Sequence, residues 1–376
     1  MGEPGRRVPR RRPLVHPHPR RRQRRRDDEG RVGGVVTTTA SPLARPSARP
    51  AGRPLSWGLL GGLAALLVLA TVSLFVGVAD LSPLDFLSGQ ATDQQQLNLF
   101  AYRIPRTAAV LLAGAALALS GLLMQLLVRN RFVEPGTVGT TESAGVGILI
   151  AVMVFPSAPL IVKMAIAVVT ALIGTAVFIR LIRALPPRAP IVAVPLVGIM
   201  LAGVISAGTT FVAYQFDLLQ SLGIWMQGDF SGVLRGRYEL LWILGAIGLV
   251  LWVFADRFTV ASLGEEQATS LGLSYTATLN LGLALVAVAS AVTLVVVGAI
   301  GFVGLIIPNL ITMWRGDNLR HNIGLTAIAG SLFVLVCDLL ARTVNFPYEI
   351  PVGTISGVLG GVIFLVLLLT GRMKTR

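Results

Sequence analysis

The chain has 376 residues, of which 54% are hydrophobic and 13% are charged, and its mean hydropathy is +0.75. Soluble domains carry about 25% charged residues, so the composition excludes an ordinary soluble protein and indicates a membrane protein. The formal net charge of +14 belongs mainly to the start of the chain. Residues 1–53 hold 15 arginines against four acidic residues, a net of +11, which leaves +3 for the rest.

Residues 1–54 are rich in Arg, Pro, Gly and Ser. Such a segment cannot bury a core, so we expect a disordered cytoplasmic tail. The functional alternative is an arm that binds anionic lipid or nucleic acid. We favour a solvated tail whose positive charges help to fix the membrane topology, and we expect no nucleic-acid partner. A cleaved signal peptide is not expected, because the first apolar run is long enough to cross a bilayer.

Residues 55–376 are predicted to form one transmembrane domain. A bilayer crossing takes about 20 residues, and the fold class that the apolar runs predict is an all-α polytopic membrane protein with about ten transmembrane helices. The apolar stretch 276–314 is longer than a single crossing, so we divide it into two predicted helices at Gly298–Gly301. The runs lie near 57–78, 107–128, 136–155, 159–182, 190–213, 238–255, 276–298, 299–314, 324–341 and 351–370. The mixed segment 214–237 predicts an outer loop with a short interfacial helix.

An even number of crossings with the basic tail inside places both termini in the cytoplasm, as the positive-inside rule favours, and the chain in the plasma membrane. This orientation puts residues 261–273 in the cytoplasm. It puts Arg103, Arg106 and Arg342 outside, where they face either lipid headgroups or the acidic side chains of a soluble partner.

The segment Ala261–Leu273 is a polar interruption between long apolar runs. Glu265 and Glu266 follow Gly264, which suits the positive end of a helix dipole, and Gly272 is where a helix of about two turns would stop. Because so short a helix is not stable alone, its own protein or a partner must hold it.

Among the few charged residues inside predicted spans are the carboxylates Glu142 and Asp338. Asp338 has Arg342 four residues on, so we predict a local ion pair rather than a proton path. Gly298, Gly301 and Gly304 recur at helical spacing, which indicates either close helix packing or a translocation path kept free of side chains. Gly114 and Gly121 have similar spacing.

The sequence offers little for chemistry. It contains no phosphate-binding loop, and its three histidines and single Cys337 have no ligand spacing, so we expect no metal site, no bound cofactor and no enzymatic activity.

Several motifs in order resemble the FecCD-type permeases of ATP-binding-cassette (ABC) importers for iron–siderophore complexes, haem and cobalamin. The resemblance spans residues 57–376. The motifs are Arg103-Ile-Pro-Arg106 with the helix 113–125 that follows, 129–136, Trp225-Met-Gln-Gly228, 263–272, 298–308, 338–342 and 349–353.

The resemblance implies a type II importer fold, a permease homodimer or a heterodimer with a paralogue, two cytoplasmic ATPases that use ATP and Mg, and an extracellular binding lipoprotein. Arg103, Arg106 and Arg342 would meet the binding protein. Pro308-Asn309, where the family usually has Pro-His, resembles the branch for catecholate or petrobactin-type siderophores. The coupling residues implied for the ATPase are Leu263, Gly264, Glu265, Glu266, Ala268 and Leu271, and the path or packing residues are Gly298, Gly301, Gly304, Pro308 and Asn309.

Three other hypotheses for the function are compatible with the sequence. A secondary transporter driven by an ion gradient would require Asp338 for transport. A cobalamin or haem importer would share the same motifs. A membrane scaffold or receptor would depend on residues 1–54.

Overall fold

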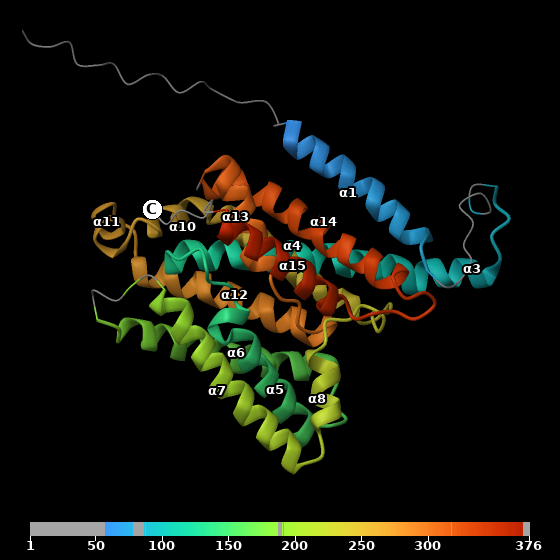
Figure 1. The fold of residues 1–376 in the computed structure, drawn as a ribbon, viewed down its shortest axis with the longest axis horizontal. Helices are drawn as coiled ribbons and strands as arrows, with labels where there is room; N and C mark the ends of the chain where they lie inside the picture. The colour runs from blue at the N-terminus through green and yellow to red at the C-terminus, as the bar shows by residue number, and fades with distance from the viewer. Residues whose placement is uncertain are drawn as a thin grey trace, which may run out of the picture. The chain divides into compact units, whose positions relative to one another are not determined.

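The structure is a computed structural model that describes residues 57–77, 86, 88–186, 190, 192–316 and 318–370. The tail predicted for residues 1–54 lies outside the described residues. The described part of the chain is built of helices and contains no strand, which confirms the all-α class (Figure 1).

The described residues contain seven helices that are long and apolar enough to cross a membrane, or eight if one bent pair counts as a single span. Two shorter apolar helices accompany them, so the predicted count of about ten is roughly consistent with the structure. The long ones are α1 (Trp57–Phe75), the continuous helix α3–η1–α4 (Asp93–Val128), α6 (Leu160–Arg183), α7 (Ala193–Gln215), α12 (Tyr275–Val297), α14 (Leu319–Thr343) and α15 (Val352–Leu369). The bent pair is Tyr238–Val253, formed by η3 and α9, with α10 (Ala255–Ala261), and the shorter helices are α5 (Thr140–Val154) and α13 (Val303–Arg315).

The centre of the bundle is α4 (Ile104–Val128), which packs on α12, α13 and α14 (Figure 1). Glycines allow these approaches. A Cβ added at Gly114 would lie 2.6 Å from the carbonyl oxygen of Gly330, and one at Gly121 would overlap the carbonyl group of Gly304. The packing predicted for Gly114 and Gly121 is therefore confirmed, and it follows the rule that small residues bring membrane helices together.

The division predicted at residues 298–301 is also confirmed. Helix α12 ends at Val297 and α13 begins at Val303. Gly298 has φ +82°, and Phe302 has the left-handed conformation with φ +68°, so neither residue continues a helix.

The short helix α8 (Leu219–Met226) lies in the segment 214–237, where the sequence predicted a short interfacial helix.

The two ends of α4 carry the features that the sequence singled out. Its 25 residues span about 37 Å at 1.5 Å per residue. Arg103 and Arg106 lie at its beginning, and the short helix α11 (Glu265–Ser270) lies near its end (Figure 1). The molecule therefore has two candidate contact regions that one rigid element connects.

Candidate functional site

Helix α11 is bounded by glycines at both ends. Gly264 has φ +109° before its first residue, and Gly272 has φ +79° after its last turn. The amide of Leu273 donates to the carbonyl of Ala268 at 3.0 Å, and that of Gly272 donates to Thr269 at 2.9 Å. This pair of bonds is the Schellman arrangement, which ends the helix where the sequence predicted.

The rest of the protein holds α11 at its beginning. Nε of Arg129 donates to the carbonyl of Ser262 at 2.8 Å, and a Cβ added at Gly264 would overlap the Arg129 guanidinium group. Ala268 is fully buried. In the sequence, Arg129 stood out only as the first residue of the motif 129–136. Its structural role depends on its left-handed backbone (φ +54°) at the end of α4, which no local pattern indicates.

The outward side of α11 combines charge with apolar surface. Glu265 and Glu266 are exposed. The flanking Leu263 and Leu271 are 50% and 67% exposed, so apolar surface lies on both sides of the two glutamates. The short helix is thus anchored to its own protein on one side and left open on the other.

At the opposite end of α4, arginines and carboxylates form an internal network. Asp338 is fully buried and accepts from Arg342 at 2.5 Å, as predicted, and also from Arg106 at 2.8 Å, which the sequence did not indicate. Arg106 further pairs with Glu349 at 2.8 Å. These bonds join α4, α14 and the segment before α15.

The three predicted docking arginines are therefore brought together, but they are largely buried. Arg342 also donates to the carbonyls of Ser73 and Val76 near the end of α1, and Arg103 donates to the carbonyl of Leu74 at 2.9 Å. A cavity of about 270 Å³ is lined by all three arginines. Their contact with a soluble partner stays a prediction, and headgroup contact is not their main environment in the structure.

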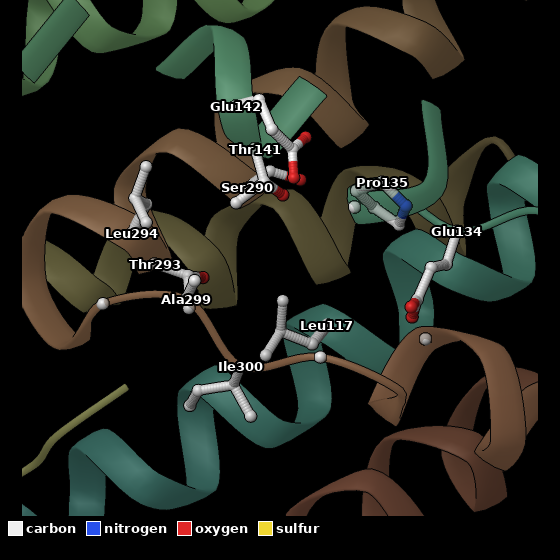
Figure 2. Close-up of a pocket in the computed structure, with 14 residues that line it drawn as sticks. Leu117, Glu134, Pro135, Thr141, Glu142, Ser290, Thr293, Leu294, Ala299 and Ile300 are labelled. Atoms are coloured by element: carbon white, nitrogen blue, oxygen red, sulfur yellow. The ribbon is translucent and has the colours of Figure 1, made fainter. Parts of the chain in front are cut away.

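The predicted path residues divide into two groups. Gly298, Gly301 and Gly304 line a cavity of about 130 Å³ between α4, α5 and α12 (Figure 2). A Cβ added at Gly298 would overlap the carbonyl of Gln227, and one at Gly304 would lie 3.0 Å from the carbonyl oxygen of Leu117. A Cβ at Gly301 would meet nothing within 4 Å. Pro308 and Asn309 lie apart from this cavity, buried within α13.

Asn309 connects α13 to the loop after α4. Its Nδ2 donates to the carbonyl of Arg131 at 2.8 Å and to that of Leu305 at 2.7 Å. The second bond is made within the helix around Pro308, which cannot donate one of its own. Asn309 is therefore a packing residue that hydrogen-bonds α13 to the loop after α4 in this structure.

Glu134 is a site residue that stood out in the sequence only as part of the motif 129–136. It is buried in the loop between α4 and α5, and its Oε1 accepts from the amide of Phe302 at 3.3 Å (Figure 2). A carboxylate there satisfies the beginning of α13. Burial raises the pKa of Glu134 to about 7, although backbone amides of Phe302, Gly304 and Leu305 act in the opposite direction.

Among the described residues, no group of three His, Cys, Asp or Glu side chains could hold a metal ion.

The fold and these sites define a polytopic helical membrane protein with an exposed short helix at one end of its central span and an arginine–carboxylate network at the other. A family model for the FecCD transport family matches residues 65–370. The chain belongs to this family.

Relatives agree with this membership. The petrobactin import system permease protein YclN of Bacillus subtilis is 43% identical over 304 residues, covering 81% of this chain and 95% of the relative. The ferric-anguibactin transport system permease protein FatD of Vibrio anguillarum is 40% identical over 275 residues, covering 73% and 87%. The structure of a metal-chelate type ABC transporter in an inward-facing conformation matches with a TM-score of 0.71 at 27% identity, covering 83% and 98%.

Proposed function

We propose that this protein is the transmembrane permease subunit of an ABC importer that moves a ferric siderophore across the plasma membrane. The relatives with petrobactin and anguibactin in their names favour this cargo over cobalamin or haem. The permease would act as a homodimer or with a paralogue, with both termini in the cytoplasm. Two separate ATPase subunits would hydrolyse ATP, and an extracellular lipoprotein would deliver the chelate.

The observation that carries the proposal is helix α11. It exposes Leu263 and Leu271 on either side of two glutamates, a surface that fits a cleft with apolar walls and basic groups. Its other side is fixed by Ala268 and Arg129. A push on α11 would therefore pass directly to α4 rather than deform a loop.

Arg129 extends this connection toward the interior. The next residues of its loop meet α13 through the bond from Asn309 to the carbonyl of Arg131, and Glu134 caps the beginning of the same helix. Movement of α11 can in this way change the conformation of the segment that separates α12 from α13. Only a difference in contacts between two states can drive such a switch.

The ion-gradient alternative finds less support. Asp338, the carboxylate that it requires, is held by two arginines and fully buried. A proton carrier in a membrane protein has to be free to exchange its proton during transport, whereas Asp338 is held in ion pairs with Arg106 and Arg342.

The test is uptake of radioactive iron by cells that lack the chromosomal gene and carry a plasmid copy. Ferric petrobactin and ferric anguibactin are the expected cargoes, and labelled cobalamin is the comparison. The proposal expects iron uptake that needs both the permease and its ATPase. Cobalamin uptake without iron uptake would overturn the cargo, and normal iron uptake without the permease would overturn the function.

A further inference from the structure

Glu142 is a carboxylate of α5 that the proposed coupling and docking surfaces do not use. It lies in the first turn of α5 and contributes to two cavities. One is the cavity of about 130 Å³ beside Gly298 and Glu134 (Figure 2). The other, of about 300 Å³, lies between α5, α7 and α8.

The charge of Glu142 has no counterpart in its surroundings. Its Oε2 atom is buried and makes no hydrogen bond with the described residues. No Lys, Arg or His is among the described residues that line either cavity. Glu134 differs, because the amide of Phe302 satisfies it. Glu142 is half-buried, and the described residues offer no donor to its buried Oε2 atom, so a bound donor would stabilise this arrangement.

The larger cavity indicates which donor fits. Ser206, Thr209 and Thr210 line the same cavity as Glu142 and carry hydroxyl groups. The Thr209 hydroxyl already donates to the carbonyl of Ile205, which leaves its oxygen as an acceptor. Leu219 and Met226 supply apolar wall. One carboxylate among hydroxyls suits an ammonium group with three N–H donors, and apolar walls suit the carbon chain that carries it.

A bare metal ion fits less well. Calcium takes six to eight oxygen ligands and magnesium demands a tight octahedron. The described lining residues of the larger cavity include a single carboxylate, and about 300 Å³ is far larger than an ion needs. The chemistry on this surface is that of an organic cation.

We propose that Glu142 binds the ammonium group of an organic cation in the cavity between α5, α7 and α8. The site would give the permease a preference for cargo that carries a protonated amine, a consequence that rests on the proposed transport function. The binding itself does not depend on transport.

The experiment measures binding to the purified permease in lipid nanodiscs. The probes are dansylcadaverine, a fluorescent alkylammonium ion, and its N-acetylated form, which has no charge. Wild-type protein is expected to bind the ammonium probe at least about tenfold more tightly than the acetylated probe. Glu142→Gln is expected to remove this difference. Glu239→Gln, which changes an exposed carboxylate outside the cavity, is the matched control and should leave it unchanged.

Equal affinity of the wild-type protein for the two probes would overturn the site, as would retention of the difference in Glu142→Gln. If Glu142→Gln does not yield folded protein, Thr210→Val tests the same cavity, and it should weaken the ammonium probe several-fold and the acetylated probe little. An unchanged ratio would then overturn the site. Failure of the transport function would appear separately, as absence of iron uptake by the wild-type importer.

Discussion

Two glycines that bound α11 have positive φ but different surroundings. A Cβ at Gly264 would overlap Arg129, whereas one at Gly272 would meet nothing within 4 Å. Gly272→Ala is therefore expected to cost only the left-handed conformation, about 1 kcal/mol. Gly264→Ala should displace Arg129 as well and reduce iron transported per ATP hydrolysed several-fold. Thermal unfolding and parallel uptake and ATPase assays check both variants; equal effects of the two would contradict the contact.

Asp338 neutralises two buried guanidinium groups, so its loss should be severe. Asp338→Asn leaves Arg106 and Arg342 facing each other's charge without a buried counter-ion, and removing one partner from a buried ion pair costs about 3–5 kcal/mol. Glu349 is 28% exposed, so Glu349→Gln should cost below about 1 kcal/mol. Thermal unfolding in detergent measures the difference, and a similar loss for both variants would show that burial of Asp338 does not control stability.

At the scale of elements, the contact between α4 and α13 depends on backbone approach. Gly121→Ala should separate the helices, since its Cβ would overlap Gly304, and overpacking costs about 1–3 kcal/mol or more. Gly357 in α15 has nothing within 4 Å of a Cβ and is the matched control, for which Gly→Ala should be neutral or stabilising. Unfolding temperatures of the two variants test the assignment; a stable Gly121→Ala protein would refute it.

Glu134 gives the loop between α4 and α5 a dependence on pH. Burial raises its pKa from 4.5 to about 7, so the folded protein keeps a proton that the unfolded chain releases. Stability should then be highest below pH 4.5 and should fall as pH rises toward 7, by about 3 kcal/mol at most. Glu142, a like charge nearby, acts in the same direction.

Comparison of wild type with Glu134→Gln isolates this contribution. The variant cannot ionise, so its unfolding temperature relative to that of the wild-type protein should increase between pH 5 and pH 8. A difference that is constant over this range would mean that Glu134 is not titrating in the folded protein.

Much of this arrangement could be predicted from the order of residues. Apolar runs gave the spans because a bilayer crossing leaves little freedom in composition, and Gly272 and Asp338–Arg342 were predicted because their partners are close in sequence. Residues whose partners are distant in sequence were missed. Arg106 pairs with Asp338 across 232 positions, and Phe302 donates to Glu134 across 168. No periodicity records such contacts.

At the scale of the whole molecule, α4 connects two regions about 37 Å apart, one beside α11 and one at the arginine network. Its close backbone contacts with α13 and α14 leave little space for internal deformation. A displacement at α11 should therefore reach the arginine network as a shift of packed helices rather than as a local bend. Binding at either end would then bias the same equilibrium.

The energy source distinguishes this permease from a secondary transporter. We expect proteoliposomes that contain the permease, its ATPase and its binding protein to accumulate ferric siderophore when ATP is enclosed with the ATPase. Ionophores that abolish the proton gradient and the membrane potential should leave the initial rate unchanged. The reason is that Asp338, the carboxylate on which an ion-driven mechanism would depend, is held in ion pairs with Arg106 and Arg342. A matched preparation with an ATPase that cannot hydrolyse ATP is the control. Uptake that survives in this control and stops with the ionophores would identify an ion-driven transporter instead.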